Sequence, residues 1–198
     1  MLYTGAVVFV LLALFIAHII APTSYDWTQH TISQLAAQGY ELSWVMNAGF
    51  IGFGTLVLAG ATKRLDHDPR WKWTEGPLVV CGAMFVLSSI FHTRPFIEGF
   101  PYSERDALIH GAMSTFARFA IVVSMLAYTI FEMHRIRKVV YLVSCLLVIG
   151  LNVMLETSQF SAGVVQRLLC GIVLVWFIFI DVEQKSFPAQ KEGKYYLQ

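Results

Sequence analysis

Charged side chains are scarce in this sequence. Asp, Glu, Lys and Arg make up 14% of its 198 residues, hydrophobic residues make up 57%, and the mean hydropathy is +0.62. A soluble domain of this length needs a more polar surface, so the composition excludes an ordinary soluble protein. The net charge of +1 gives no electrostatic reason to expect binding to nucleic acid. The composition is that of an integral membrane protein.

Cysteine and catalytic sequence motifs are also scarce. The three cysteines, Cys81, Cys145 and Cys170, all fall within apolar stretches, which argues against a loop disulfide and against a cysteine-based zinc site. No GxSxG motif marks a serine nucleophile. The glycine-rich stretch "NAGFIGFG" lacks the lysine of a phosphate-binding loop. Its small residues predict a surface against which a neighbouring helix packs closely.

Long apolar runs dominate what remains. Six of them approach the length needed to cross a hydrocarbon core of about 30 Å, and they predict a single-domain, all-α, polytopic six-transmembrane-helix bundle. The predicted spans lie near residues 2–21, 42–62, 77–93, 107–131, 138–155 and 164–181. The loop at 22–41 has Ile32, Leu35 and Ala36 at helical spacing. We expect this loop to contain a short helix and to cover one face of the bundle as a lid.

The cations are distributed unevenly along the chain. Ten of the 14 Lys and Arg residues fall on one predicted side: Lys63, Arg64, Arg70, Lys72, Arg135, Arg137, Lys138, and Lys185, Lys191 and Lys194 in the tail at 182–198. Because cytoplasmic loops carry an excess of Lys and Arg, this bias predicts that both termini are cytoplasmic. The expected location is the cell membrane, with membrane lipids as partners. The oligomeric state is not indicated.

Polar residues recur within the spans at helical spacing. Asp106, His110, Ser114 and Arg118 occupy every fourth position on one side of the span at 107–131. Further polar residues in or beside the spans are Asn47, Ser88, His92, Asn152, Glu156, Gln166 and Arg167. Under the predicted orientation all of these lie in the outer half of the membrane, whereas the inner halves carry mainly Cys81, Ser124, Thr129 and Ser144. We therefore expect a polar pocket that opens outward, not a channel through the membrane.

Two arginines within spans suggest what such a pocket binds. A guanidinium in a site of low dielectric constant suits a carboxylate or phosphate, so an anionic lipid or other amphiphile is the expected ligand. The predicted ligand-binding residues are Arg118, Arg167, His110, Ser114, Asn47, Asn152 and Gln166. In the alternative interpretation, Arg118 pairs with Glu156 only to fix helix packing, and the protein is a non-catalytic helical scaffold or a subunit of a membrane complex.

A third interpretation is a metal-dependent membrane hydrolase. His30, His92 and His110 would supply the three ligands that catalytic zinc commonly has, with Glu156 or Asp106 as base. A serine nucleophile, Ser33, Ser88 or Ser114, is a further possibility. The candidate catalytic residues are therefore His110, His92, Glu156 and Ser33. Apart from this zinc site, no cofactor is predicted.

Four stretches of the sequence resemble a known family of integral membrane proteins. They are "TISQLAAQG", "NAGFIGFGTLVL", "GFPYSERDALIHGAMSTF" and "GVVQRLLCGIVLVWF", and they are similar to the family of unknown function DUF998. The resemblance implies six helices and no established activity. The residues that match the family pattern are Ser33, Leu35, Asn47, Phe100, Pro101, His110, Arg167 and Trp176. Gln34 and Ala36 depart from it, because family members often carry an acidic residue and a glycine there.

Overall fold

The computed structural model of the chain describes residues 1–65, 71–97, 99–157 and 161–186, and all regular secondary structure in these ranges is helical. The elements are α1 (Leu2–Ile19), the 3-10 helix η1 (Ile32–Ala36), α2 (Ser43–Leu65), α3 (Trp71–Thr74), α4 (Gly76–Ser88), α5 (Glu104–Phe131), α6 (Arg135–Thr157) and α7 (Ala162–Ser186). Five of them, α1, α2, α5, α6 and α7, are long and apolar enough to cross a membrane. This confirms the all-helical, membrane-type fold. Arg70 and most of the predicted cytoplasmic tail lie outside the described residues.

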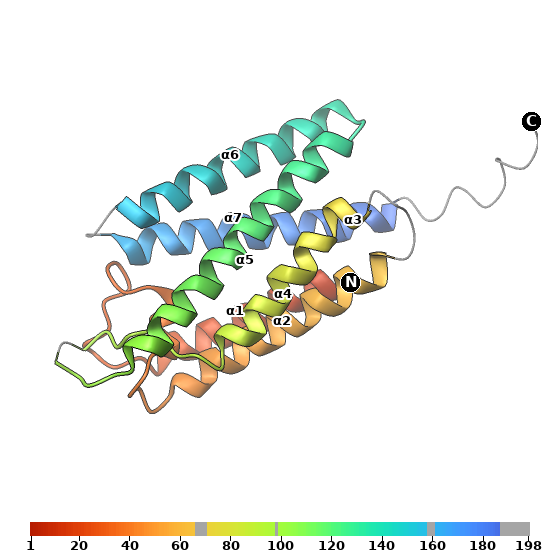
Figure 1. Cartoon of the computed structure of the whole chain (residues 1–198). Helices are drawn as coiled ribbons and strands as arrows, with labels where there is room; N and C mark the ends of the chain where they lie inside the picture. The colour runs from red at the N-terminus through yellow and green to blue at the C-terminus, as the bar shows by residue number, and fades with distance from the viewer. Residues whose placement is uncertain (66–70, 98, 158–160, 187–198) are drawn as a thin grey trace, which may run out of the picture.

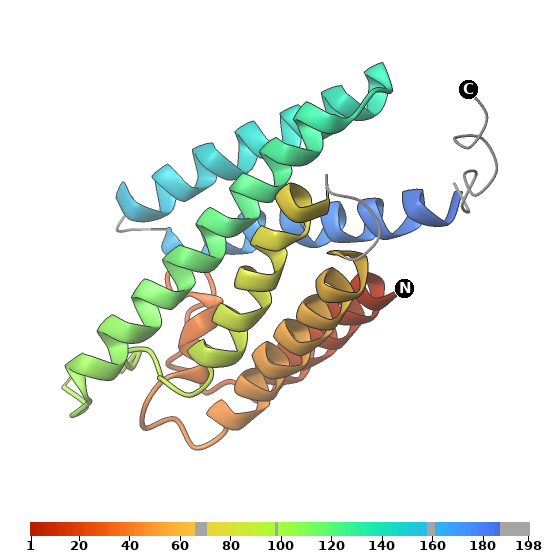
Figure 2. The same cartoon turned by 45° about the vertical axis from the view of Figure 1, so that its right-hand side comes forward.

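The helices form a ring in which each packs on its neighbours. Around the ring, α1 packs on α2, α2 on α4, α4 on α5, α5 on α6 and α6 on α7. Contacts between α7 and α1 close the ring. Figures 1 and 2 show that α1 begins and α7 ends at one end of this bundle, which we call the termini end. The opposite end, which we call the loop end, carries η1, the loop at 22–41 and the segment at 89–103. The loop end therefore holds the polar residues that the sequence analysis grouped together.

Helix α4 is shorter than the span predicted at 77–93. It has 13 residues and begins with Pro77 in its first turn, a position that proline favours because the missing N–H would have no partner there. Its length is about 20 Å, less than a hydrocarbon core of about 30 Å. It ends at Ser88, where His110 Nδ1 lies 2.9 Å from the Ser88 carbonyl oxygen and 2.8 Å from that of Phe91. A side chain from α5 thus bonds to backbone oxygens that the helix end leaves free.

Two apolar clusters fill the interior of the ring. One lies between all the crossing helices and includes Phe53, Met125 and Trp176. The other lies at the loop end, where Ile32, Leu35 and Ala36 of η1 are buried against α1 and α2. These three η1 residues confirm the predicted short helix in the loop. Burial of its apolar face holds this element against the bundle.

Small residues bring α2 and α4 close together, as the glycine-rich stretch predicted. A methyl group on Gly54 would lie 2.6 Å from the backbone oxygen of Gly82, and one on Gly82 would lie 2.7 Å from the oxygen of Gly54. Both distances are shorter than real side chains show, so the approach of the two helices requires glycine at both positions.

The loop at 22–41 is held on the first turn of α7. The Gly163 N–H donates to the Gln29 carbonyl oxygen at 3.2 Å, and the Val164 N–H donates to that of Thr28 at 3.2 Å. These are two of the N-terminal N–H groups that a helix cannot satisfy by itself. Within the loop, Thr31 and Gln34 form a capping box at the start of η1. Gln34 Oε1 thus accepts the hydrogen bond from the Thr31 N–H, a role that a glutamate oxygen could also fill.

Replacement of Gly163 by alanine is expected to lower the free energy of unfolding by about 1–3 kcal/mol. The new methyl carbon would lie 2.4 Å from the Trp27 carbonyl oxygen and 2.6 Å from that of His30, so the loop would have to move away. Gly171→Ala on the same helix is the control, because its added methyl would meet no atom within 4 Å. Tryptophan fluorescence during unfolding in mixed micelles measures both variants. Equal stability of the two would contradict the expectation.

Candidate functional site

A cavity of about 110 Å³ lies inside the ring, where the two apolar clusters meet. Its wall is formed by side chains of α1, η1, α2, α4, α5 and α7, none of which is fully exposed. Most of this lining is apolar and includes Phe50, Phe53, Phe85, Ile121, Leu169 and Val173. An apolar cavity of this order of size, about 150 Å³ in a well-studied case, holds a ligand such as benzene. This cavity therefore has room for part of a hydrocarbon chain.

Six polar residues complete the lining: Ser33, Ser88, His110, Ser114, Arg118 and Gln166. They come from η1, the end of α4, the first half of α5 and the first turns of α7. All of these segments lie towards the loop end (Figure 1). The polar groups of the lining therefore gather towards the loop end and the middle of the bundle, where apolar side chains such as Ile32 and Phe50 also line the cavity. A few polar groups that converge on an apolar pocket are typical of sites for small amphiphilic molecules.

Arg118 lines the cavity and makes an ion pair with Glu156. Its Nη2 donates to Glu156 Oε1 at 2.7 Å and to Thr115 Oγ1 at 3.0 Å. The Arg118 side chain is 20% exposed and that of Glu156 is 67% exposed. Among the described residues, Nη1 and Nε of Arg118 make no hydrogen bond. The guanidinium therefore has donors left for a second acceptor, and its present partner is in contact with the surroundings of the protein.

The His110 side chain is buried, and the residue is 4% exposed. Its Nδ1 lies near the two carbonyl oxygens at the end of α4, as described above. Its Nε2 is buried and has no hydrogen-bond partner among the described residues. A buried polar atom without a partner is uncommon and calls for an explanation.

Two other lining residues join the loop to the cavity wall. Gln166 Oε1 accepts a hydrogen bond from the Ile32 N–H at 2.5 Å, which satisfies a donor at the start of η1. Ser33 lies beside Thr31, with 3.0 Å between their hydroxyl oxygens. Through Ile32 and Ser33, the loop at 22–41 thus forms part of the cavity wall.

The other predicted ligand-binding residues lie outside the cavity lining. Arg167 Nη1 donates to the carbonyl oxygens of His30 (3.0 Å) and Gly163 (2.9 Å), and its Nη2 contacts His18 Nε2 (2.9 Å) and donates to Tyr25 Oη (2.7 Å). These contacts join the loop at 22–41 to α1 and α7. Two further predicted residues are engaged differently. Asn152 donates to the Val148 carbonyl of its own helix, and Asn47 is buried with its side-chain oxygen unpartnered among the described residues.

The three histidines of the zinc hypothesis do not form a metal-ligand cluster in this structure. The described residues contain no group of three or more His, Cys, Asp or Glu side chains placed to hold one ion. His30 Nδ1 accepts a hydrogen bond from the Asp26 N–H at 2.9 Å within the loop. The backbone carbonyl of His92 accepts from Gln38. Of the three, only His110 lines the cavity.

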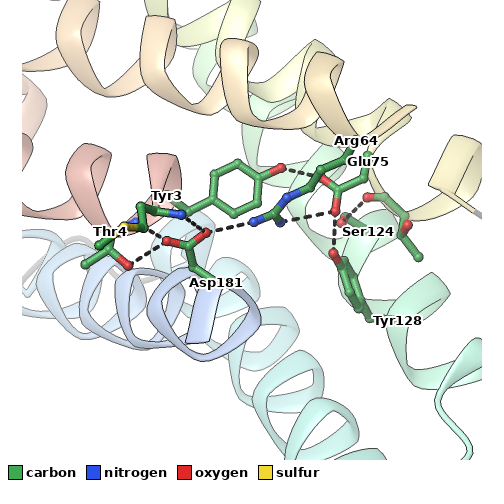
Figure 3. A network of polar contacts seen from close by, with 9 residues as sticks. Tyr3, Thr4, Arg64, Glu75, Ser124, Tyr128 and Asp181 are labelled. Carbon is green, nitrogen blue, oxygen red and sulfur yellow. Dashed lines mark hydrogen bonds and ion pairs between the residues drawn. The ribbon is translucent and has the colours of Figure 1, made fainter. Parts of the chain in front are cut away.

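A second polar network lies at the termini end of the bundle (Figure 3). Arg64 of α2 lies between two acidic residues, with its Nη2 2.7 Å from Asp181 Oδ1 and its Nη1 3.4 Å from Glu75 Oε1. Glu75 also accepts hydrogen bonds from the hydroxyls of Tyr3 and Tyr128. The Arg64 guanidinium lies over the Tyr3 ring, 4.1 Å from its centre. The network joins α1, α2, α5, α7 and the junction of α3 and α4.

This network corrects the sequence analysis. The prediction that the inner halves of the spans carry mainly small polar groups is wrong, because Glu75 is 0% exposed and Asp181 is 1% exposed. The sequence analysis counted Arg64 only among the cations on one predicted side and did not single out Glu75 or Asp181. The feature of the sequence that could have indicated this network is the position of Glu75 and Asp181 at the ends of long apolar runs, where tyrosines also occur.

Comparison with known proteins gives one match. The family model described as "Protein of unknown function (DUF998)" matches residues 4–182, which covers most of the chain. No curated protein matches this sequence, and no solved structure matches it. The function therefore has to be inferred from the cavity and its residues.

Proposed function

We propose that this chain, which belongs to the DUF998 family of proteins of unknown function, binds an anionic amphiphile in the cavity between its helices. The anionic headgroup bonds to Arg118, and the hydrocarbon chain lies against the apolar walls. The observation that carries this proposal is the composition of the lining, in which one cation and five neutral polar side chains converge on an otherwise apolar cavity.

Charge and packing support this choice of ligand. A cation among apolar side chains is costly unless an anion accompanies it, and the planar guanidinium of Arg118 can bind a carboxylate or phosphate through two parallel hydrogen bonds. Apolar walls favour a hydrocarbon chain by about 25 cal/mol per Å² of surface removed from water. An amphiphile satisfies the cation and the apolar walls at once.

Glu156 acts in this proposal as a competitor that the ligand displaces. Its carboxylate holds Arg118 at 2.7 Å, yet two thirds of its side chain is exposed. An exposed carboxylate loses little when it leaves an ion pair, because exposed ion pairs contribute about 0–1 kcal/mol. A ligand anion can therefore take over the guanidinium while Glu156 moves into the surroundings of the protein.

The setting we propose is the cell membrane, with lipids as partners and the termini end in the cytoplasm. The cations support this orientation, because Lys63 at the end of α2, Lys72 in α3 and the cluster at 135–138 at the start of α6 lie at the termini end. The loop end, towards which the polar lining residues gather, then faces the outer leaflet. A lipid of that leaflet is the ligand source closest to Arg118.

Substitutions of Arg118 and Glu156 are expected to have opposite effects on the affinity for dodecyl phosphate. In neutral detergent, Arg118→Gln should bind dodecyl phosphate at least tenfold more weakly than the wild type, because the cation is lost. Glu156→Gln should bind it several-fold more tightly, because the competing anion is lost. Arg105→Gln, which removes an exposed cation from the same helix, is the control and should leave the affinity unchanged. Native mass spectrometry across a titration gives the three affinities.

A location test accompanies these affinities. Cys170 lines the cavity, whereas Cys81 and Cys145 are buried elsewhere in the core. Bound dodecyl phosphate should therefore slow the reaction of Cys170 with a membrane-permeant maleimide. If all three variants and the wild type bind equally, and Cys170 is not protected, the amphiphile site does not exist. The Arg118 and Glu156 pair then only fixes helix packing.

A further inference from the structure

We infer that the ligand is a single-chain lipid whose headgroup carries a hydroxyl group beside its anion, and that this hydroxyl donates a hydrogen bond to His110 Nε2. This inference rests on the proposed function and specifies the chemistry of the molecule that the cavity binds. It follows from the tautomer of His110, from the position of its ring and from the size of the cavity.

The hydrogen bonds of His110 determine which of its ring nitrogens carries the proton. Carbonyl oxygens only accept hydrogen bonds, and Nδ1 lies 2.9 Å and 2.8 Å from two of them. The proton is therefore on Nδ1, where it is shared between the ends of α4 and the following turn. A second proton on Nε2 would create a charge in a buried setting where, among the described residues, this atom has no hydrogen-bond partner. Nε2 is thus a hydrogen-bond acceptor.

This acceptor belongs to a residue that lines the cavity, and it is buried without a partner among the described residues. An unsatisfied buried acceptor costs about 1–3 kcal/mol, and a ligand that supplies a donor recovers part of that loss. A fully ionised phosphate or carboxylate cannot supply it, because its oxygens only accept hydrogen bonds. A hydroxyl group can donate to Nε2 and remain neutral inside the cavity.

The positions of His110 and Arg118 suit a short spacer between hydroxyl and anion. The Arg118 guanidinium reaches back towards the loop end, where its Nη2 lies 3.0 Å from Thr115 Oγ1. Five residues separate His110 from Thr115, a rise of about 7.5 Å along the helix. Two hydrogen bonds of about 3 Å and a few covalent bonds span an axial rise of this order. A glycerol phosphate, with a hydroxyl on the carbon next to the phosphoester, has this arrangement.

The cavity volume selects one hydrocarbon chain over two. At about 110 Å³ the cavity is of the order of one that holds a single benzene ring, so it takes up a segment of one hydrocarbon chain and has no room for a second chain beside it. A 1-acyl-glycerol-3-phosphate therefore combines the three required features: one chain, one anion and one free hydroxyl.

Two probes that differ in one O–H group test the inference. They are 1-lauroyl-glycerol-3-phosphate and its 2-O-methyl ether, titrated into the full-length protein in neutral detergent. The wild type should bind the hydroxyl form about tenfold more tightly than the ether, the factor that corresponds to one hydrogen bond to a buried acceptor. His110→Asn keeps a side-chain N–H near the α4 carbonyls and removes the ring acceptor. It should bind the two probes equally.

The outcomes separate this inference from the proposed function. If the wild type binds neither probe, both fail. If it binds both with equal affinity, the amphiphile site stands and the role of His110 is overturned, with a water molecule as the partner of Nε2. His134→Asn, a substitution of an exposed histidine at the other end of α5, is the control and should keep the tenfold preference. The wild-type comparison decides the question even if His110→Asn does not fold.

Discussion

Replacing Arg64 with alanine is expected to lower the free energy of unfolding by about 3–5 kcal/mol, the largest stability loss that we predict for a single substitution. The side chains of Glu75 and Asp181 are 0% exposed, and Arg64 contacts both. Without it, Glu75 keeps only the two tyrosine hydroxyls, which leaves a carboxylate buried without a cation. Unfolding in mixed micelles, followed by tryptophan fluorescence, measures the loss.

Two further variants show whether charge is the cause. Lys63→Ala removes the exposed cation next to Arg64 and should change the stability by less than about 0.5 kcal/mol. The double variant Arg64→Ala with Glu75→Gln removes both members of one pair, so it should lose less than the two single variants together. If Arg64→Ala is no less stable than Lys63→Ala, the network has no role in holding the helices together.

Replacing Arg167 with alanine should destabilise the loop at 22–41 and cost about 2–4 kcal/mol. Its guanidinium contacts four acceptors on three parts of the chain, and it lies 5.9 Å from the centres of the Tyr25 and Trp27 rings. Loss of these charged hydrogen bonds removes the side-chain contacts that Arg167 makes between the loop and α7, and the His30 carbonyl keeps only the Tyr25 hydroxyl, at 3.3 Å, among the side-chain donors in the described residues. Hydrogen exchange should show faster exchange of the amides of this loop, and unfolding should occur at a lower denaturant concentration.

Two substitutions at Arg167 distinguish a role in anchoring the loop at 22–41 from a role in binding the ligand. Arg167→Lys keeps the charge but cannot reach four acceptors at once, so it should show most of the same loss. Arg105→Ala provides the comparison for an exposed arginine at the loop end. If Arg167→Ala folds as stably as the wild type and only loses affinity for dodecyl phosphate, Arg167 belongs to the ligand site and not to the anchor of the loop.

The two arginines within the spans thus differ in a way that their sequence context does not show. Both are single cations in apolar helices. Among the described residues, both Nη atoms of Arg167 make contacts within the protein, whereas Arg118 makes its hydrogen bonds through Nη2 alone and lines the cavity. The difference arises because the loop at 22–41 returns over α7 and brings its carbonyl groups to Arg167.

The sequence by itself determined the class of the protein and the helix faces on which many of its polar residues lie. Apolar runs predicted the helices, because hydrophobic transfer and backbone hydrogen bonding both act over short stretches of chain. Helical spacing placed His110, Ser114 and Arg118 on one side of α5, and all three line the cavity. The short helix with Ile32, Leu35 and Ala36 was also predictable from its spacing. The family of the chain was identified from short stretches and is confirmed by the match to residues 4–182.

Only the tertiary structure decided which of the polar residues meet. The contacts that define the network at the termini end join residues 72 and 117 positions apart, Tyr3 with Glu75 and Arg64 with Asp181. The early end of α4 likewise depends on His110, which comes 22 residues after Ser88. Such pairings depend on how separate helices lie beside one another. Periodicity within one helix fixes the face on which a side chain lies, but it carries no information about the partner that another helix brings to that face.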